Sequence, residues 1–250
     1  MDKAGEQYWE KIWDQKSDIH KIDTNYYTYS LLHQLFKYYL EYNSQKSICE
    51  IGCAMSPYLL CFHDKFGYKI NGFDYEKSSI IKTKQIYNEM GYEANIFYQD
   101  LFGNYEGEKF DILTSFGVFE HFENLENSIA HTKKYIKDNG IIITVIPNMN
   151  GIVGFLQKRF NKRVYDIHIP YTKDDLLKAH EKNGYSTLFC DYFGLYQFGV
   201  VNIDGIKNED IVRKIFAIPG KLFYYFYKFS KLRLDSVYNS PYVIYIGKKI

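Results

Sequence analysis

From about residue 47 to residue 192, short apolar runs alternate with longer segments whose apolar residues recur at helical spacing. A strand that is buried on both faces must be almost wholly apolar, as the run IIITVI at residues 141–146 is. Strands of this kind that alternate with helices are typical of a parallel sheet covered by helices. The pattern therefore predicts an α/β fold.

Seven strands are expected, in a mostly parallel sheet with helices on both faces. They cover about residues 47–52, 69–74, 93–98, 110–115, 141–146, 186–192 and 242–246. The helices are expected after Pro57, over about 76–90 and 125–136, and from Thr172 to Gly184. The last of these begins with a capping box, because an aspartate follows Thr172 three residues on.

The chain before the first strand shows helical spacing, so residues 1–44 are expected to form an N-terminal helical cap. Residues 45–250 form the expected core, with insertions at 147–170 and 194–239. The first insertion is expected to be irregular.

The second insertion contains an aromatic segment at residues 215–229, IFAIPGKLFYYFYKF. Pro219 and Gly220 interrupt this segment, so we expect that it does not form one long helix. Its apolar residues are interspersed with lysines, which fits a lid, a dimer interface or a membrane-surface element. We favour a lid or an interface, and a homodimer stays open as an alternative.

The charge balance restricts the partners of the chain. Basic residues number 31 and acidic residues 30, so the formal net charge is +1. Bulk nucleic-acid binding needs a surplus of Lys and Arg, so no nucleic-acid partner is expected. No apolar run reaches the roughly 20 residues that span a bilayer, and the N-terminus has no signal-peptide pattern. The four cysteines form no C-x-x-C pair, which favours free thiols and a cytoplasmic location.

The turn after the first strand, EIGCAMS at residues 50–56, carries the strongest functional signal. Ligands of open parallel sheets bind at the carboxyl ends of the strands. Gly52 lets the backbone approach a ligand closely. Acids also follow the next two strands, at Asp74 and Asp100. The turn is not a G-x-G-x-x-G fingerprint, and the chain has no P-loop motif.

Five segments appear in the order EIGCA, GFDY, QDL, FDILTSFGVFEHF and KDNGIIITVIPN. In this order and at this spacing they resemble the class I S-adenosylmethionine-dependent methyltransferases, over about residues 47–192. The resemblance implies a Rossmann-like sheet, S-adenosylmethionine as cofactor and a small-molecule acceptor.

The resemblance also implies a cofactor site at the turn and the following strand ends. Its residues are Trp9, Glu50, Gly52, Cys53, Ala54, Asp74, Tyr75, Asp100, Leu101, Phe116 and Gly117. By this resemblance Glu50 and Gly52 lie near the methionine moiety. Asp74 binds the ribose, and Asp100 binds the adenine amino group. Ala54 stands where the family has a second glycine, and alanine is tolerated there if its φ is negative.

The aromatic segment YWEKIW at residues 8–13 resembles the leading helix of small-molecule members, which closes over the cofactor. An alternative is that this helix packs on the core, because tryptophan side chains are usually mostly buried. Both interpretations stay open.

Two histidines are candidate catalytic residues, because transfer to oxygen usually needs a base and histidine titrates nearest to neutral pH. By resemblance, His121 sits beside the methyl-transfer centre. His168 lies in YDIHIP at residues 165–170, a segment that borders the acceptor pocket in related enzymes. A purely structural role stays open for each histidine. No metal-ligand spacing is visible, so metal-independent catalysis is expected.

A basic cluster in the first insertion consists of Lys158, Arg159, Lys162 and Arg163. Its ordinary interpretation is a solvated face. Its functional interpretation is an anion clamp for a phosphorylated or nucleotide-linked acceptor. The candidate substrate-binding residues are Arg159, Arg163 and Tyr171.

The segments PNMNG and YDIHIP after the fifth strand resemble bacterial enzymes that modify surface polysaccharides. This resemblance implies O-methylation of a small acceptor, such as a sugar or a capsule phosphoramidate precursor. N- or C-methylation of another metabolite is an alternative. A non-catalytic cofactor-binding module is a second alternative, although the acids at positions 50, 74 and 100 count against it.

Overall fold

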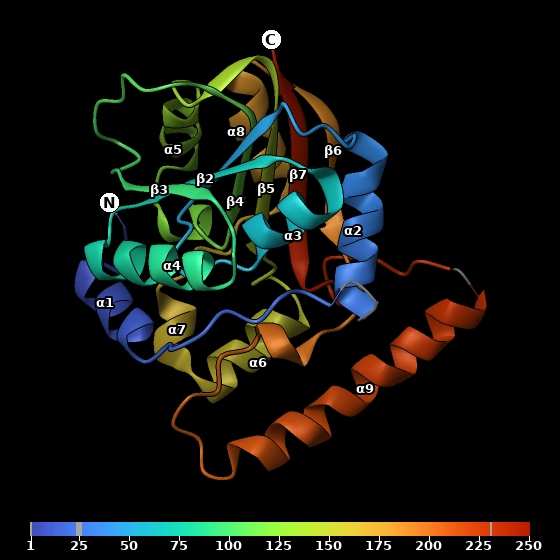
Figure 1. Cartoon of the computed structure of the whole chain (residues 1–250). Helices are drawn as coiled ribbons and strands as arrows, with labels where there is room; N and C mark the ends of the chain where they lie inside the picture. The colour runs from blue at the N-terminus through green and yellow to red at the C-terminus, as the bar shows by residue number, and fades with distance from the viewer. Residues whose placement is uncertain (1, 24–26, 231) are drawn as a thin grey trace.

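The computed structural model describes residues 2–23, 27–230 and 232–250. Its centre is one seven-stranded sheet with the strand order β3-β2-β1-β4-β5-β7-β6 (Figure 1). The strands are β1 Ser47–Ile51, β2 Lys69–Asp74, β3 Ala94–Tyr98, β4 Phe110–Phe116, β5 Ile136–Pro147, β6 Tyr185–Phe193 and β7 Tyr242–Lys249. Only β7 runs antiparallel to its neighbours. The seven strands and the mostly parallel sheet predicted from the sequence are confirmed.

Helices cover both faces of this sheet (Figure 1). They are α1 Glu6–Asp14, α2 Tyr27–Tyr39, α3 Tyr58–Phe66, α4 Lys77–Glu89, α5 Leu125–Thr132, α6 Ile152–Phe160, α7 Lys162–Asp166, α8 Lys173–Lys182 and α9 Glu209–Ser230. Two short 3₁₀ helices, η1 Phe119–His121 and η2 Phe198–Val200, complete the set among the described residues. The predicted capping box of α8 is present, since Thr172 and Asp175 bond to each other's backbone.

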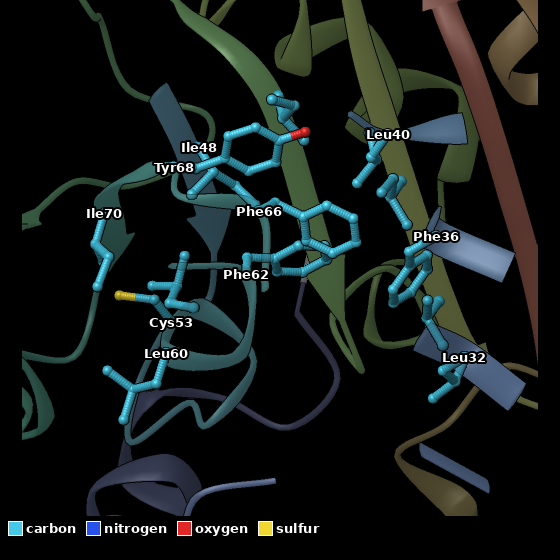
Figure 2. Packing of buried hydrophobic residues seen from close by; sticks show 14 of the residues in the cluster. Leu32, Phe36, Leu40, Ile48, Cys53, Leu60, Phe62, Phe66, Tyr68 and Ile70 are labelled. Carbon is cyan, nitrogen blue, oxygen red and sulfur yellow. The ribbon is translucent and has the colours of Figure 1, made fainter. Parts of the chain in front are cut away.

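Alternate residues of each central strand point to opposite faces, which divides the core into two layers. Ile48 of β1 packs with α2, α3 and α4 on one face, whereas Cys49 packs with α5 and α8 on the other. Figure 2 shows part of the first layer, in which Phe36 of α2 lies against Phe62 of α3 with ring centroids 5.3 Å apart. The two layers fix the sheet, and the functional groups lie at one of its edges.

Three local expectations from the sequence are wrong. The N-terminal cap is not continuously helical, because residues 16–23, which follow α1, have no regular secondary structure and carry mostly polar side chains. The 147–170 insertion is not irregular, because Val153 and Leu156 of α6 and Val164 of α7 bury an apolar side. The helix expected over 125–136 ends at Thr132, and β5 begins at Ile136.

The aromatic insertion does form one continuous helix, α9, with Pro219 inside it, so that prediction is also wrong. The turn of α9 that precedes the proline packs against other parts of the chain. Phe216 stacks on Phe198 and meets Phe160 edge-on. The Tyr196 hydroxyl donates to the Phe216 carbonyl at 3.0 Å. Tertiary packing therefore offsets the roughly 3 kcal/mol that an interior proline costs. Figure 1 shows α9 along the outside of the molecule.

The outer side of α9 is apolar and exposed. Its exposed large side chains are Ile211, Ile215, Ile218, Leu222, Tyr225, Phe226 and Phe229. Among the described helices, none is both long and apolar enough to cross a membrane.

Candidate active site

A cavity of about 900 Å³ lies at the carboxyl ends of β1, β2 and β4. The strand order reverses between β1 and β4, and ligands of open α/β sheets bind at such a switch point. The cavity is lined from the sheet side by residues that include Glu50, Gly52, Ala54, Asp74, Tyr75, Asp100, Leu101, Phe116, Gly117 and His121. The sequence-predicted cofactor residues are thus brought together, while Cys53 lies buried behind the turn.

The turn after β1 has the conformation that its glycine requires. Gly52 has a φ of +68°, and an added Cβ would lie 2.7 Å from Val118 Cγ2. The backbone N–H groups of Gly52 and Cys53 both donate to the Phe73 carbonyl of β2. Ala54 is not among the described residues with positive φ. Alanine therefore fits this position without backbone strain.

Two buried carboxyls face the cavity from this turn. The Ser56 hydroxyl donates to Glu50 at 2.7 Å, and the Ala54 N–H donates to Asp74 at 3.2 Å. Burial raises the pKa of Glu50 to about 8 and the pKa of Asp74 to about 6. Neither carboxyl has a cationic partner among the described residues. The wall is therefore suited to a ligand that brings hydroxyl donors or positive charge.

The far end of the cavity is built from the loop after β3. Asp100 accepts a hydrogen bond from the Phe102 N–H at 2.9 Å, and Leu101 is buried beside it. On the opposite side, Phe116 stacks on Tyr58 with ring centroids 3.8 Å apart. These apolar surfaces flank polar groups, as is usual in small-molecule sites.

Helix α1 forms the outer wall of the cavity. Trp9 and Trp13 both line it, and the Trp9 ring meets His121 edge-on at 5.1 Å. Asp2 holds this segment in place, since it accepts hydrogen bonds from Trp9 Nε1 at 3.2 Å and from the Tyr75 hydroxyl at 2.6 Å. No residue of α1, which is described throughout, is buried. The helix therefore lies over the cavity on few contacts.

The two candidate catalytic histidines are neighbours. Their ring centroids lie 4.6 Å apart, and His121 lines the cavity whereas His168 lies behind it. His121 Nδ1 bonds to the Ile167 carbonyl at 3.0 Å, and His168 Nδ1 bonds to the Val164 carbonyl at 2.5 Å. Both Nδ1 atoms must carry the proton, which leaves both Nε2 atoms unprotonated in the neutral rings. Burial lowers the pKa of His121 and lowers that of His168 to about 4.

A family model described as a methyltransferase domain matches residues 21–188, which is more than half of the chain. The chain belongs to this methyltransferase family. It is an S-adenosylmethionine-dependent methyltransferase, and S-adenosylmethionine is its cofactor. No curated protein sequence matches the methyltransferase significantly.

Solved structures agree with the methyltransferase fold. The PH0226 protein from Pyrococcus horikoshii OT3 superposes with a TM-score of 0.62 at 11% identity, covering 98% of this chain and 100% of that one. A SAM-dependent methyltransferase from Archaeoglobus fulgidus superposes with a TM-score of 0.55 at 14% identity, covering 88% and 94% respectively. At these identities the similarity concerns the Rossmann-like fold.

The predicted substrate-binding residues of the methyltransferase lie outside the cavity lining in the described structure. The Arg163 guanidinium lies over the Tyr8 ring of α1, 6.0 Å from its centroid. Tyr171 donates its hydroxyl to the Phe122 and Glu123 carbonyls, at 2.7 and 3.0 Å. Arg159 belongs to α6, which packs on α7, and its side chain is exposed.

Asp2, Lys16 and Glu120 belong to the site but were not predicted from the sequence. Asp2 and Lys16, at the two ends of the α1 segment, line the cavity although neither belongs to a recognisable motif. Glu120 is buried beside His121, with its Oε1 3.9 Å from His121 Nε2. The adjacent acid and histidine in GVFEHF could have indicated from the sequence that Glu120 belongs to the site. Helix α9, the candidate lid, contributes no described residue to the cavity lining.

Proposed function

We propose that this methyltransferase methylates a hydroxyl oxygen of a small, phosphorylated or nucleotide-linked acceptor, such as a sugar or phosphoramidate precursor of a surface polysaccharide. The observation that carries the proposal is a pair of adjacent histidines, His121 on the cavity wall and His168 behind it. Their Nδ1 atoms both bond to backbone carbonyls, so the Nε2 atoms of the neutral rings are free to accept a proton. A hydroxyl must lose its proton as it is methylated, and such a pair can promote that loss.

The residues at the strand ends fit the cofactor. Asp74 is the proposed acceptor for the ribose hydroxyls, and Asp100 for the adenine amino group. Leu101 supplies an apolar surface for the adenine ring, while Phe116 and Gly117 form the opposite wall. Glu50, which has no cationic partner in the described part of the chain, lies beside the turn proposed to hold the methionine moiety. Cofactor binding supplies a methyl group activated on a sulfonium ion.

The protein side of the reaction consists of alignment, exclusion of water and removal of a proton. Trp9 and Trp13 shield the cavity from solvent, which favours displacement over hydrolysis. As a C–O bond forms and the C–S bond breaks, the hydroxyl proton must leave. A neutral histidine pair can promote the loss of this proton in two ways. Either an Nε2 atom accepts the proton, or the pair binds a cation that makes the hydroxyl more acidic.

The charges around the cavity constrain the acceptor. Carboxyl groups predominate in the lining and Lys16 is its one described basic residue, so an acceptor phosphate is disfavoured inside. The basic residues of α6 and α7 lie outside, next to α1 through Arg163 and Tyr8. We propose that Arg159 and Arg163 hold the anionic part there while the hydroxyl reaches the histidines. The cavity is near the upper end of typical ligand-site volumes, roughly 300–1,000 Å³, which leaves room for both reactants.

The first test is calorimetric titration with S-adenosylmethionine and S-adenosylhomocysteine, followed by acceptor screening with nucleotide-linked sugars. His121→Ala is expected to lower turnover by about 10²–10⁴-fold while cofactor affinity stays similar. His20→Ala, at an exposed position outside the cavity lining, is the matched control. Product analysis by NMR that shows methylated nitrogen or carbon would overturn O-methylation. Cofactor binding without turnover on any acceptor would favour a non-catalytic module.

A further inference from the structure

Three donor groups converge where η1 meets the residues after α7. One nitrogen of His121, one nitrogen of His168 and one oxygen of Glu120 all lie within 4.8 Å of one another. Glu120 and His121 are adjacent in the chain, whereas His168 comes from a segment 47 positions after His121. The fold, and not local sequence, brings the three groups together.

The histidines are oriented as metal ligands usually are. Each Nδ1–H is held by a backbone carbonyl, at Ile167 and at Val164, so each Nε2 is presented as a lone-pair donor. A ligating histidine almost always donates its other ring N–H to such a carbonyl or to a carboxylate, which fixes the tautomer and the ring orientation.

The third group is a buried carboxyl, one oxygen of which lacks a hydrogen-bond partner in the described part of the chain. Glu120 is 1% exposed, and its Oε2 has no hydrogen-bond partner among the described residues. A buried carboxyl normally pairs with a cation or accepts hydrogen bonds, because its desolvation is costly. An unpartnered carboxylate oxygen next to two lone-pair nitrogens points to a cation between them.

The cluster is rigidly supported and also has room. The Ile169 N–H donates to the Glu120 carbonyl at 2.7 Å, so η1 and residues 167–169 are joined by two hydrogen bonds that include His121 Nδ1. A Cβ at Gly117 would lie 3.4 Å from Glu120 Oε1, so the glycine leaves the carboxyl free to turn. Bonds of about 2.0–2.2 Å to one ion require each side chain to move by about 1 Å or less.

We infer that Glu120, His121 and His168 bind one divalent transition-metal ion of the Zn²⁺ class, with an open position toward the cavity. Two imidazole nitrogens and one carboxylate are the donor set of catalytic zinc and of non-haem Fe²⁺ sites. His121 lines the cavity, so the free position faces the proposed acceptor site. Magnesium fits less well, because it prefers oxygen ligands and retains its waters.

The ion explains how the histidine pair serves the proposed function, on which this part of the inference rests. An acceptor hydroxyl at the open position is more acidic when it is bound to the ion, and its proton leaves to the solution as the acceptor binds, before water is excluded. The resulting oxygen attacks the methyl group, the C–O bond forms, and the sulfonium becomes a neutral thioether. This chemistry differs from the metal-independent catalysis expected from the sequence.

The test measures metal binding without any acceptor. Chelator-stripped protein is titrated with Co²⁺, followed by its visible d–d absorption, and then with Zn²⁺ in competition. One Co²⁺ per chain is expected, displaced by Zn²⁺. His168→Gln and Glu120→Gln are expected to weaken binding by about 10–100-fold or more. His131→Gln, which alters a histidine outside the cluster, is expected to bind as the wild type does.

Two further readouts separate this inference from the proposed function. Thermal unfolding and S-adenosylhomocysteine affinity of the Glu120→Gln protein are expected to match the wild type, which would exclude general misfolding. If stripped protein binds no Co²⁺, or if the three variants bind it equally, the metal site is wrong. If Co²⁺ binds as expected but no hydroxyl acceptor is methylated, the metal site stands and O-methylation fails.

Discussion

Gly52 and Ala54 lie two positions apart in one turn, yet their backbones tolerate different side chains. Gly52 has positive φ and faces Val118 so closely that a methyl group would clash. The φ angle of Ala54 is not positive, and its N–H donates to Asp74. The departure from a second glycine is therefore compatible with an intact turn.

These two positions give a matched pair of variants. Gly52→Ala is expected to lower the free energy of unfolding by about 1–3 kcal/mol, because of left-handed strain and the clash. It is also expected to weaken S-adenosylhomocysteine binding. Ala54→Gly is expected to leave the dissociation constant within about twofold, with at most about 1 kcal/mol of destabilisation. Calorimetry and chemical denaturation measure both effects. Equal losses of affinity in the two variants would contradict this account of the turn.

Some residues of the site could be predicted from the sequence and others could not. Asp74 and Asp100 were predictable, because the carboxyl ends of parallel strands meet at one edge. Glu120 was not, because its significance depends on His168, which only the folded chain brings near. Asp2 was missed for the same reason, since its partner Tyr75 lies far away in the sequence.

At the level of elements, α1 depends on a small number of contacts. It has no buried residue, and Asp2 ties it to Tyr75 and Trp9. Lys82 of α4 adds a hydrogen bond to the Trp13 carbonyl at 3.0 Å. A helix held in this way opens at a low free-energy cost, because few buried apolar contacts resist the motion.

Tyr75→Phe removes the hydrogen bond to Asp2 and keeps the aromatic ring. We expect faster amide hydrogen exchange over Glu6–Asp14 and faster release of S-adenosylhomocysteine, by about 3–10-fold, as loss of one hydrogen bond of about 1 kcal/mol implies. Exchange mass spectrometry and stopped-flow fluorescence of the two tryptophans measure these rates. Tyr98→Phe, at an exposed position, is the control. Unchanged exchange in α1 would mean that Asp2 does not hold this helix.

Strands and peripheral helices also differed in predictability. The central strands carry their own pattern, because burial on both faces demands continuous apolar residues. The helices α6, α7 and α9 depend on packing partners distant in sequence, as Phe216 does on Phe198 and Phe160. Tertiary contacts therefore stabilise α9 as one helix, although Pro219 predicts an interruption. These contacts join residues that lie far apart in the sequence, so a local sequence pattern does not reveal them.

For the molecule as a whole, the buried acids of the cavity make stability depend on pH. In the unfolded chain Asp and Glu ionise near pH 4, whereas burial raises the pKa of Glu50 to about 8 and that of Asp74 to about 6. The folded state then binds more protons than the unfolded state between about pH 4.5 and 8. The stability that these groups contribute therefore falls as pH rises through that window.

The midpoint of thermal unfolding of the cofactor-free, metal-free protein is accordingly expected to fall between pH 6.5 and 8.5. Below about pH 6.5 the buried neutral His180, whose pKa burial lowers to about 3, acts in the opposite direction. Glu50→Gln keeps an oxygen that accepts from Ser56, and is expected to flatten the decline. Glu106→Gln, at an exposed position, serves as the control. A midpoint that rises over this range would contradict the burial of ionisable carboxyls.

Helix α1 also bears on the order of events in a catalytic cycle. Because Trp9 and Trp13 line the cavity on its outer side, we expect reactants to enter and products to leave when α1 is displaced. The opening rate of α1 then sets an upper limit on turnover, however fast the chemical step is. A cofactor that enters before α1 settles would make binding sequential, with cofactor first and acceptor second. Steady-state rates should accordingly decrease as solvent viscosity increases.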